Sequence, residues 1–109
     1  MAYDETLVGR VRGSLAGRSG IDERRMFGGL AFMLDGNMCC CVTEHGLMVR
    51  VGPDAYEDAL AQPHAGVMDM TGRPMRGWVL VELEGLASDA SLAQWAAQGA
   101  DFAATLPPK

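Results

Sequence analysis

The sheet of this protein is decided near the start of the chain, in residues 23–41, which read ERRMFGGLAFMLDGNMCCC. Bulky apolar residues over 26–34 predict a strand, and Asp35-Gly36 is a strong signal for a two-residue hairpin turn. Residues 37–43 then predict a second strand that returns antiparallel to the first. All the cysteines of the chain lie in this returning strand. The interpretation of the stretch therefore depends on whether the cysteines are reactive groups or packing residues.

The three consecutive cysteines could bind a metal, react, or pack. Strand alternation places Cys39 and Cys41 on one face, about 6.6 Å apart along the strand, and Cys40 on the other. Zinc usually takes four close ligands, and the only histidines of the chain are His45 and His64. A disulfide between neighbours would strain the strand, and a nucleophilic thiolate needs an imidazole or a positive setting. We therefore expect reduced, metal-free cysteines that act as small buried hydrophobic residues.

Apolar periodicity and turn residues divide the rest of the chain into further elements. Together with the hairpin they predict one domain over 1–109, of class α+β, in two layers with a five-stranded antiparallel sheet. The expected order is α-β-β-β-α-β-β-α, with helices at 4–16, from Pro53 to the stop at Gln62-Pro63, and from Ser88 to 106, and strands at 26–34, 37–43, 47–51, 67–70 and 78–83.

Composition limits the classes of function. The chain has 109 residues and a formal charge of -5, from 14 acidic and 9 basic residues, which disfavours direct binding to nucleic acid or an anionic membrane. No apolar run reaches the roughly 18 residues of a membrane span, and the acidic N-terminus lacks the pattern of a secretory signal. We expect a reduced cytoplasmic protein without a cofactor, and with no export signal.

Two stretches combine residues that bind ligands or partners. Arginines bind phosphate or carboxylate, and paired glycines let a ligand approach the backbone. An exposed cluster of arginine, methionine and tryptophan resembles a protein-binding hot spot. The candidate residues are Arg24, Arg25, Met26, Phe27, Gly28 and Gly29 in the first stretch, and Arg73, Met75, Arg76 and Trp78 in the second.

Each stretch also has a structural interpretation. The first matches neither the dinucleotide-binding nor the P-loop pattern, and could be the start of a strand with a bulge, where glycine leaves space for a helix. The second could be a loop whose Trp78 packs in the core. Paired acidic residues such as Asp22-Glu23 are more typical of solvated turns than of a catalytic dyad, so we expect no enzymatic activity.

The chain resembles the TfoX/Sxy family, in its N-terminal domain, over about residues 5–106. The resemblance is carried by Arg24, the motif Met26-Phe27-Gly28-Gly29, Asp35-Gly36, Gly46-Leu47, Met75, Trp78, and Leu92, Ala93, Trp95 and Ala96. It implies an α+β fold of the secretion-chaperone-like kind and carries over no catalytic residue. In full-length members a C-terminal helical domain follows, and the pair coactivates competence genes with a transcription factor. We expect the present chain, which ends at Lys109, to be a stand-alone form of the N-terminal domain. Its three cysteines replace the small or aromatic residues usual in the second strand.

These observations support two hypotheses of different classes. The first is a non-enzymatic protein-interaction module, an accessory to transcription or competence regulation, whose protein partner the sequence does not name. The second is a small-molecule or anion binder, or a weak enzyme, that uses Arg24, Arg73 and Arg76 beside Gly28-Gly29. The arginines must converge for the second hypothesis to hold.

We also expect a homodimer. Helices on one side of the sheet would leave its other face needing cover, and Phe32, Met38, Met48 and Met70 are the residues expected on that face.

Overall fold

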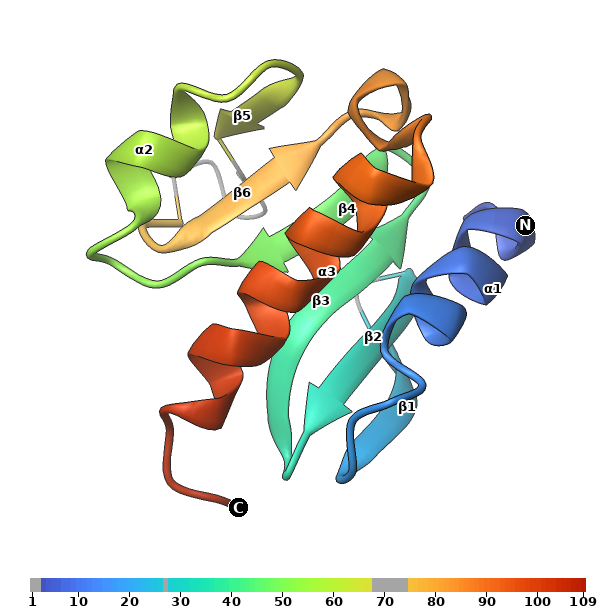
Figure 1. Cartoon of the computed structure of the whole chain (residues 1–109), viewed down its shortest axis with the longest axis vertical. Helices are drawn as coiled ribbons and strands as arrows, with labels where there is room; N and C mark the ends of the chain where they lie inside the picture. The colour runs from blue at the N-terminus through green and yellow to red at the C-terminus, as the bar shows by residue number, and fades with distance from the viewer. Residues whose placement is uncertain (1–2, 27, 68–74) are drawn as a thin grey trace.

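A computed structural model describes residues 3–26, 28–67 and 75–109. The described chain forms helices α1 (Glu5–Ser14), α2 (Tyr56–Leu60) and α3 (Asp89–Ala104), a 3₁₀ turn η1 (Leu83–Leu86), and six strands. The strands are β1 (Ile21–Met26), β2 (Gly29–Leu34), β3 (Asn37–Thr43), β4 (Gly46–Arg50), β5 (Ala65–Val67) and β6 (Trp78–Val81). They form one open antiparallel sheet in the order β1-β2-β3-β4-β6-β5 (Figure 1).

The predicted α+β class is confirmed, but the predictions of five strands and of the order α-β-β-β-α-β-β-α are wrong, because β1 was missed and four strands lie between α1 and α2. Its sequence IDERRM carries four consecutive charged residues, so no period-2 apolar alternation marks it. A strand at the edge of a sheet tolerates such a pattern because much of it remains in water. The stretch expected as one strand over 26–34 is instead the end of β1, a hairpin connection and β2.

Local signals placed most of the remaining boundaries. Asp35 and Gly36 have φ of 50° and 87°, which is the geometry of the predicted hairpin turn between β2 and β3. Asp4 caps α1, because its carboxylate accepts from the backbone N–H of Thr6 at 2.8 Å. Ser88, where the last helix was expected to begin, caps α3 by accepting from the N–H of Ser91 at 3.1 Å.

The last two strands differ from the prediction. The strand expected over 67–70 overlaps the described structure only at Val67, the end of β5, and residues 68–70 lie outside the described part of the chain. The strand expected over 78–83 ends at Val81. Leu83 begins η1, which leads directly into α3.

The main core lies between the sheet and the layer formed by α1 and α3. Figure 1 shows α3 running across the front of the sheet with α1 beside it. Three ion pairs tie the N-terminal region to its surroundings: Arg10 to Asp89 at 3.1 Å, Arg18 to Asp101 at 2.8 Å, and Arg12 to Glu23 at 2.6 Å. The first two join it to α3 and the third to β1.

The opposite face of the sheet carries a second apolar group, here called the methionine cluster. Its buried members are Ala31, Met33, Met38, Cys41 and Met48, with Met26, Met75, Trp78 and Leu80 packed against them. Met38 and Met48 lie on this face as predicted. Phe32 does not, because it packs in the main core on the helix side, and Met70 lies outside the described residues.

The methionine cluster changes the argument for a homodimer. Met38 retains 7% of its surface and Met48 none within the single chain. The second face of the sheet therefore does not present these methionines to a partner. The homodimer stays a prediction, but exposed methionines on this face no longer support it.

Candidate functional site

The glycine-rich motif of the first candidate stretch forms a hairpin connection. β1 ends at Met26 and β2 begins at Gly29, with the two residues paired across the hairpin. Gly28 has φ of +73°, a conformation that glycine adopts without steric cost. A Cβ atom at Gly29 would overlap the carbonyl oxygen of Val42 on β3. The backbone therefore explains both glycines: Gly28 by its positive φ and Gly29 by its closeness to β3. Phe27 lies outside the described residues.

The arginines of the two stretches that the structure describes do not converge. Arg24 and Arg25 are exposed on β1, and Arg24 Nε lies 3.8 Å from Asp22 Oδ2. Arg76 precedes β6, so β2, β3 and β4 separate it from β1, a distance of about 19 Å at the usual strand spacing. The register also puts Met26 and Trp78 toward opposite ends of the strands. Arg73 lies outside the described residues, so the structure brings together no site from Arg24 and Arg76.

Trp78 and its neighbours serve packing. The indole of Trp78 is half-buried against the methionine cluster together with Met75. The guanidinium carbon of Arg50 lies 5.3 Å from the centre of the Trp78 ring and 5.6 Å from that of Phe102. The exposed Arg76 lies over Tyr56, at 5.7 Å. Of the two interpretations of this stretch, the structure favours a loop whose tryptophan packs inward.

The cysteines lie in the interior, as predicted, and are free thiols. The simple alternation expected for them is wrong at Cys39. Phe32 pairs with Cys40 and Met33 with Met38, so Cys39 is the extra residue of a β-bulge. Cys39 and Cys40 therefore both pack in the main core, and Cys41 in the methionine cluster.

Burial makes these thiols poor nucleophiles. Burial raises the pKa of Cys39 to about 11, although Arg18 and Arg50 lower it slightly, and raises that of Cys41 to about 11. The pKa of Cys40 is raised well above its ordinary range, first by burial and then by the neighbouring thiols. The reactive form of cysteine is the thiolate, so these groups stay protonated and unreactive at neutral pH. Among the described residues no group of three or more histidine, cysteine, aspartate or glutamate side chains could hold a metal ion.

A groove of about 560 Å³ lies between α3 and the segment that runs from α2 to β5. Here it is called the α2–α3 groove. Its lining mixes polar and apolar surface and comes from α2, the turn after it, η1 and α3. The lining side chains that carry a polar atom are Asp58, Gln62, His64, Glu84, Ser88, Ser91, Gln94, Trp95 and Gln98.

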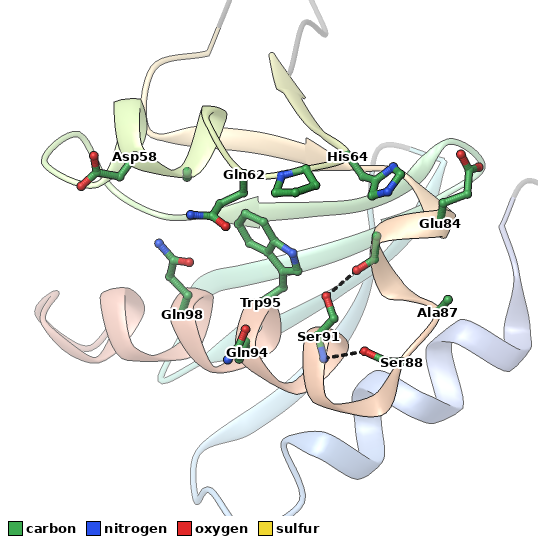
Figure 2. Close-up of a pocket in the computed structure, with 13 residues that line it drawn as sticks. Asp58, Gln62, His64, Glu84, Ala87, Ser88, Ser91, Gln94, Trp95 and Gln98 are labelled. Atoms are coloured by element: carbon green, nitrogen blue, oxygen red, sulfur yellow. Dashed lines mark hydrogen bonds between the residues drawn. The ribbon is translucent and has the colours of Figure 1, made fainter.

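Figure 2 shows how these side chains lie. The indole of Trp95 points from α3 toward the segment that carries Gln62 and His64. Only 7% of Trp95 is exposed, so the ring forms an apolar floor between the two walls. Gln94 and Gln98 are on the same helix, four residues apart and therefore on neighbouring turns.

One wall of the groove holds an unusual backbone. His64 has φ of +66°, which is uncommon for a residue with a side chain. Its carbonyl oxygen accepts from the N–H of Glu82 at 2.9 Å. A Cβ atom at Gly85 would lie 2.8 Å from His64 Cβ, so the absence of a side chain at Gly85 leaves room for the histidine.

The other wall is fixed by two serines at the start of α3. Ser91 Oγ donates to the carbonyl oxygen of Gly85 at 2.5 Å, and Ser88 Oγ accepts from Ser91 N–H (Figure 2). These bonds hold η1 against α3, so the groove has a defined shape between its fixed walls.

Sequence reasoning did not predict this groove. Trp95 is a buried residue of the last helix, but the lining of the other wall comes from residues some 30 positions earlier. The available signal was the pair Gln94 and Gln98 flanking an inward tryptophan. A helix turn with amides beside a large aromatic ring is suited to contact a ligand as well as the core.

The fold defines a small α+β domain built on an open, six-stranded antiparallel sheet. The chain belongs to the TfoX N-terminal domain family, whose profile matches residues 14–103. This assignment agrees with the resemblance found in the sequence, and the family is tied to the regulation of competence. No curated protein and no solved structure gave a significant match. Among the described residues, no helix is long and apolar enough to cross a membrane.

Proposed function

We propose that this chain is a non-enzymatic protein-interaction module that acts as an accessory in competence-type transcription regulation. The observation that carries the proposal is the α2–α3 groove, with its polar walls and tryptophan floor, in a member of the TfoX N-terminal domain family. Tryptophan is enriched at binding hot spots, and the exposed part of Trp95 lies among the polar side chains that a partner would contact.

The lining of the groove favours a basic, hydrogen-bonding segment of a partner protein. Asp58 and Glu84 are exposed on opposite sides of it, and no lysine or arginine of the described chain lines it. The amide groups of Gln62, Gln94 and Gln98 can both donate and accept, as an extended peptide backbone requires.

The chemistry of the thiols supports a non-enzymatic role. The cysteines have raised pKa values and are buried in the sheet, away from the groove residues. A nucleophile must reach its substrate as well as be deprotonated, and these groups meet neither condition.

A small polar molecule is the second candidate for the groove. Its volume of about 560 Å³ falls in the range of small-molecule sites. The carboxylates disfavour an anion here, and the separation of Arg24 from Arg76 disfavours the anion site expected from the sequence. A neutral or cationic ligand is the form of the second hypothesis that the groove supports.

The test is selection of peptides from a random library on the immobilised chain, followed by titration of a selected peptide into ¹⁵N-labelled protein. We expect selected peptides rich in lysine or arginine. We also expect shifts in the Trp95 indole N–H and in the side-chain amides of Gln94 and Gln98. Selection of acidic peptides, or shifts confined to other surfaces, would contradict a groove that binds basic segments.

Charge reversal supplies matched controls. Asp58→Lys places a cation at the groove, whereas Glu57→Lys makes the same change on an exposed neighbour in α2 that does not line it. Glu84→Lys and Glu82→Lys form a second pair of this kind. Binding should fall about tenfold or more for the lining variants only. Affinity capture from native extract then tests the regulatory role, which fails if only metabolic enzymes co-purify.

A further inference from the structure

The outer edge of β1 offers a surface unrelated to the groove. β1 is the first strand of the sheet, and in the described chain it pairs only with β2 (Figure 1). It is six residues long, in regular register with β2 throughout. An edge of this kind presents unpaired N–H and C=O groups to which another strand can add.

The register identifies which backbone groups point outward. The N–H of Asp35 donates to the carbonyl of Gly20 at 3.0 Å, so positions 20 and 35 form a hydrogen-bonded pair at one end of the hairpin. Hydrogen-bonded pairs alternate with non-hydrogen-bonded pairs in an antiparallel ladder. Positions 22, 24 and 26 therefore bond to β2. The N–H and C=O groups of Ile21, Glu23 and Arg25 point away from it.

We propose that β1 pairs antiparallel with β1 of a second copy of this chain, about a two-fold axis at Glu23, so that the two sheets become continuous. Such an axis stands perpendicular to the sheet and keeps the helix face of both copies on the same side. Ile21, Glu23 and Arg25 of one copy then bond to Arg25, Glu23 and Ile21 of the other. This uses every outward backbone group of the strand.

Charge complementarity selects this partner and this register. Asp22 and Arg24 pair with Met33 and Ala31, so both project from the face of the methionine cluster. In the proposed dimer, Asp22 lies directly opposite Arg24 of the second copy, and the symmetry repeats the contact. Two cross-strand pairs of opposite charge form, each between side chains that are exposed in the single chain.

The helix face of the strand is compatible with the same axis. The two Glu23 side chains meet there, but each is already held by Arg12 of its own α1, at 2.6 and 2.8 Å. Arg12 lowers the pKa of Glu23, which keeps the carboxylate charged and paired. Arg25 lies opposite Ile21 and diagonally across from Glu23 of the second copy.

The neighbouring two-fold register is less favourable. An axis at Arg24 would place the two Arg24 side chains directly opposite each other and would set Asp22 against Met26. Arg24 has only the 3.8 Å contact with Asp22 to offset this repulsion, whereas Glu23 has a bidentate partner in Arg12. Like charges directly opposite each other destabilise a pair of strands.

Sedimentation equilibrium over a range of protein concentrations tests the proposal, with charge swaps at the two opposed positions. Asp22→Arg sets arginine opposite arginine, and Arg24→Asp sets aspartate opposite aspartate. We expect each single swap to weaken dimerisation about tenfold. The double swap D22R/R24D restores opposite charges in the Glu23-centred register and should recover the affinity of the original chain.

Amide hydrogen exchange supplies an independent readout of the same register. On dimerisation the N–H groups of Ile21, Glu23 and Arg25 should become protected, while those of Asp22, Arg24 and Met26 should be protected at every concentration. A chain that stays monomeric at millimolar concentration overturns the proposal. So does a dimer that ignores the single swaps, or a double swap that fails to restore association.

Discussion

A Cβ atom at Gly99 would overlap the backbone carbonyl oxygen of Cys39, so α3 touches the sheet at the bulge in β3. The bulge turns Cys39 and Cys40 toward the helix, and glycine lets the helix come close enough to cover them. The packing of Cys39 and Cys40 therefore depends on the position of α3.

We predict that Gly99→Ala destabilises the protein. Alanine favours a helix over glycine by roughly 1 kcal/mol, but the added methyl group meets a backbone atom that has no room to move. The free energy of unfolding should fall by about 2 kcal/mol in urea denaturation. Gly9→Ala in α1 is the matched control, because outside its own helix no atom of the described chain lies within 4 Å of its added Cβ. That variant should gain about 0.5–1 kcal/mol, and equal effects of the two substitutions would contradict the close approach at Gly99.

Gly29→Ala should destabilise the protein by more than about 2 kcal/mol, because its Cβ would overlap the carbonyl oxygen of Val42 in the neighbouring strand. Gly66→Ala provides the comparison within the same sheet, since no neighbouring atom of the described residues lies within 4 Å of a Cβ added at that position in β5. We expect Gly66→Ala to be neutral or slightly stabilising in thermal unfolding. If Gly29→Ala were also neutral, the motif Met-Phe-Gly-Gly would need an explanation other than backbone packing.

The raised thiol pKa values predict a loss of stability at high pH. Burial lifts the pKa of Cys39 and Cys41 from about 9 to about 11, so the folded state binds more protons than the unfolded state between these values. The free energy of unfolding should therefore be independent of these thiols below pH 9 and fall between pH 9 and about 11. Urea denaturation across this range measures the slope, which Cys41→Ala should reduce.

The same burial predicts how the thiols react. At pH 8 a thiol reagent should label the native protein only as fast as it unfolds, and Cys40→Ala should cost about 1 kcal/mol. Cys40→Asp should cost far more, because it buries an unpaired charge. Rapid labelling of all three cysteines in the native protein, or stoichiometric zinc in material purified without added metal, would refute this account.

Arg50→Ala should cost about 1 kcal/mol of stability. The guanidinium group lies against the rings of both Trp78 and Phe102, and its removal loses the two cation–π contacts and the packing of its stem. The tryptophan emission should change as well, since Trp78 loses a neighbour. Arg24→Ala is the control, on an exposed side chain of β1; in dilute, monomeric protein it should change stability by less than about 0.5 kcal/mol.

Local chemistry in the sequence determined much of the fold. Asp35-Gly36 requires two left-handed residues and so specified the hairpin, and Ser88 before an apolar repeat specified the start of α3. The cysteines lie in the strand that returns from this hairpin, which was enough to place them inside the sheet. Signals of this kind depend only on a few neighbouring residues, so they can be recognised from the sequence alone.

Tertiary structure alone decided the other features. β1 is a strand because β2 pairs with it, not because its charged residues favour one. The bulge at Cys39 forms where α3 presses on β3, and it reverses the face expected for one cysteine. The α2–α3 groove joins residues about 30 positions apart, and the separation of Arg24 from Arg76 follows from the strand order. No local pattern encodes these relations, because each depends on which distant segment supplies the neighbour.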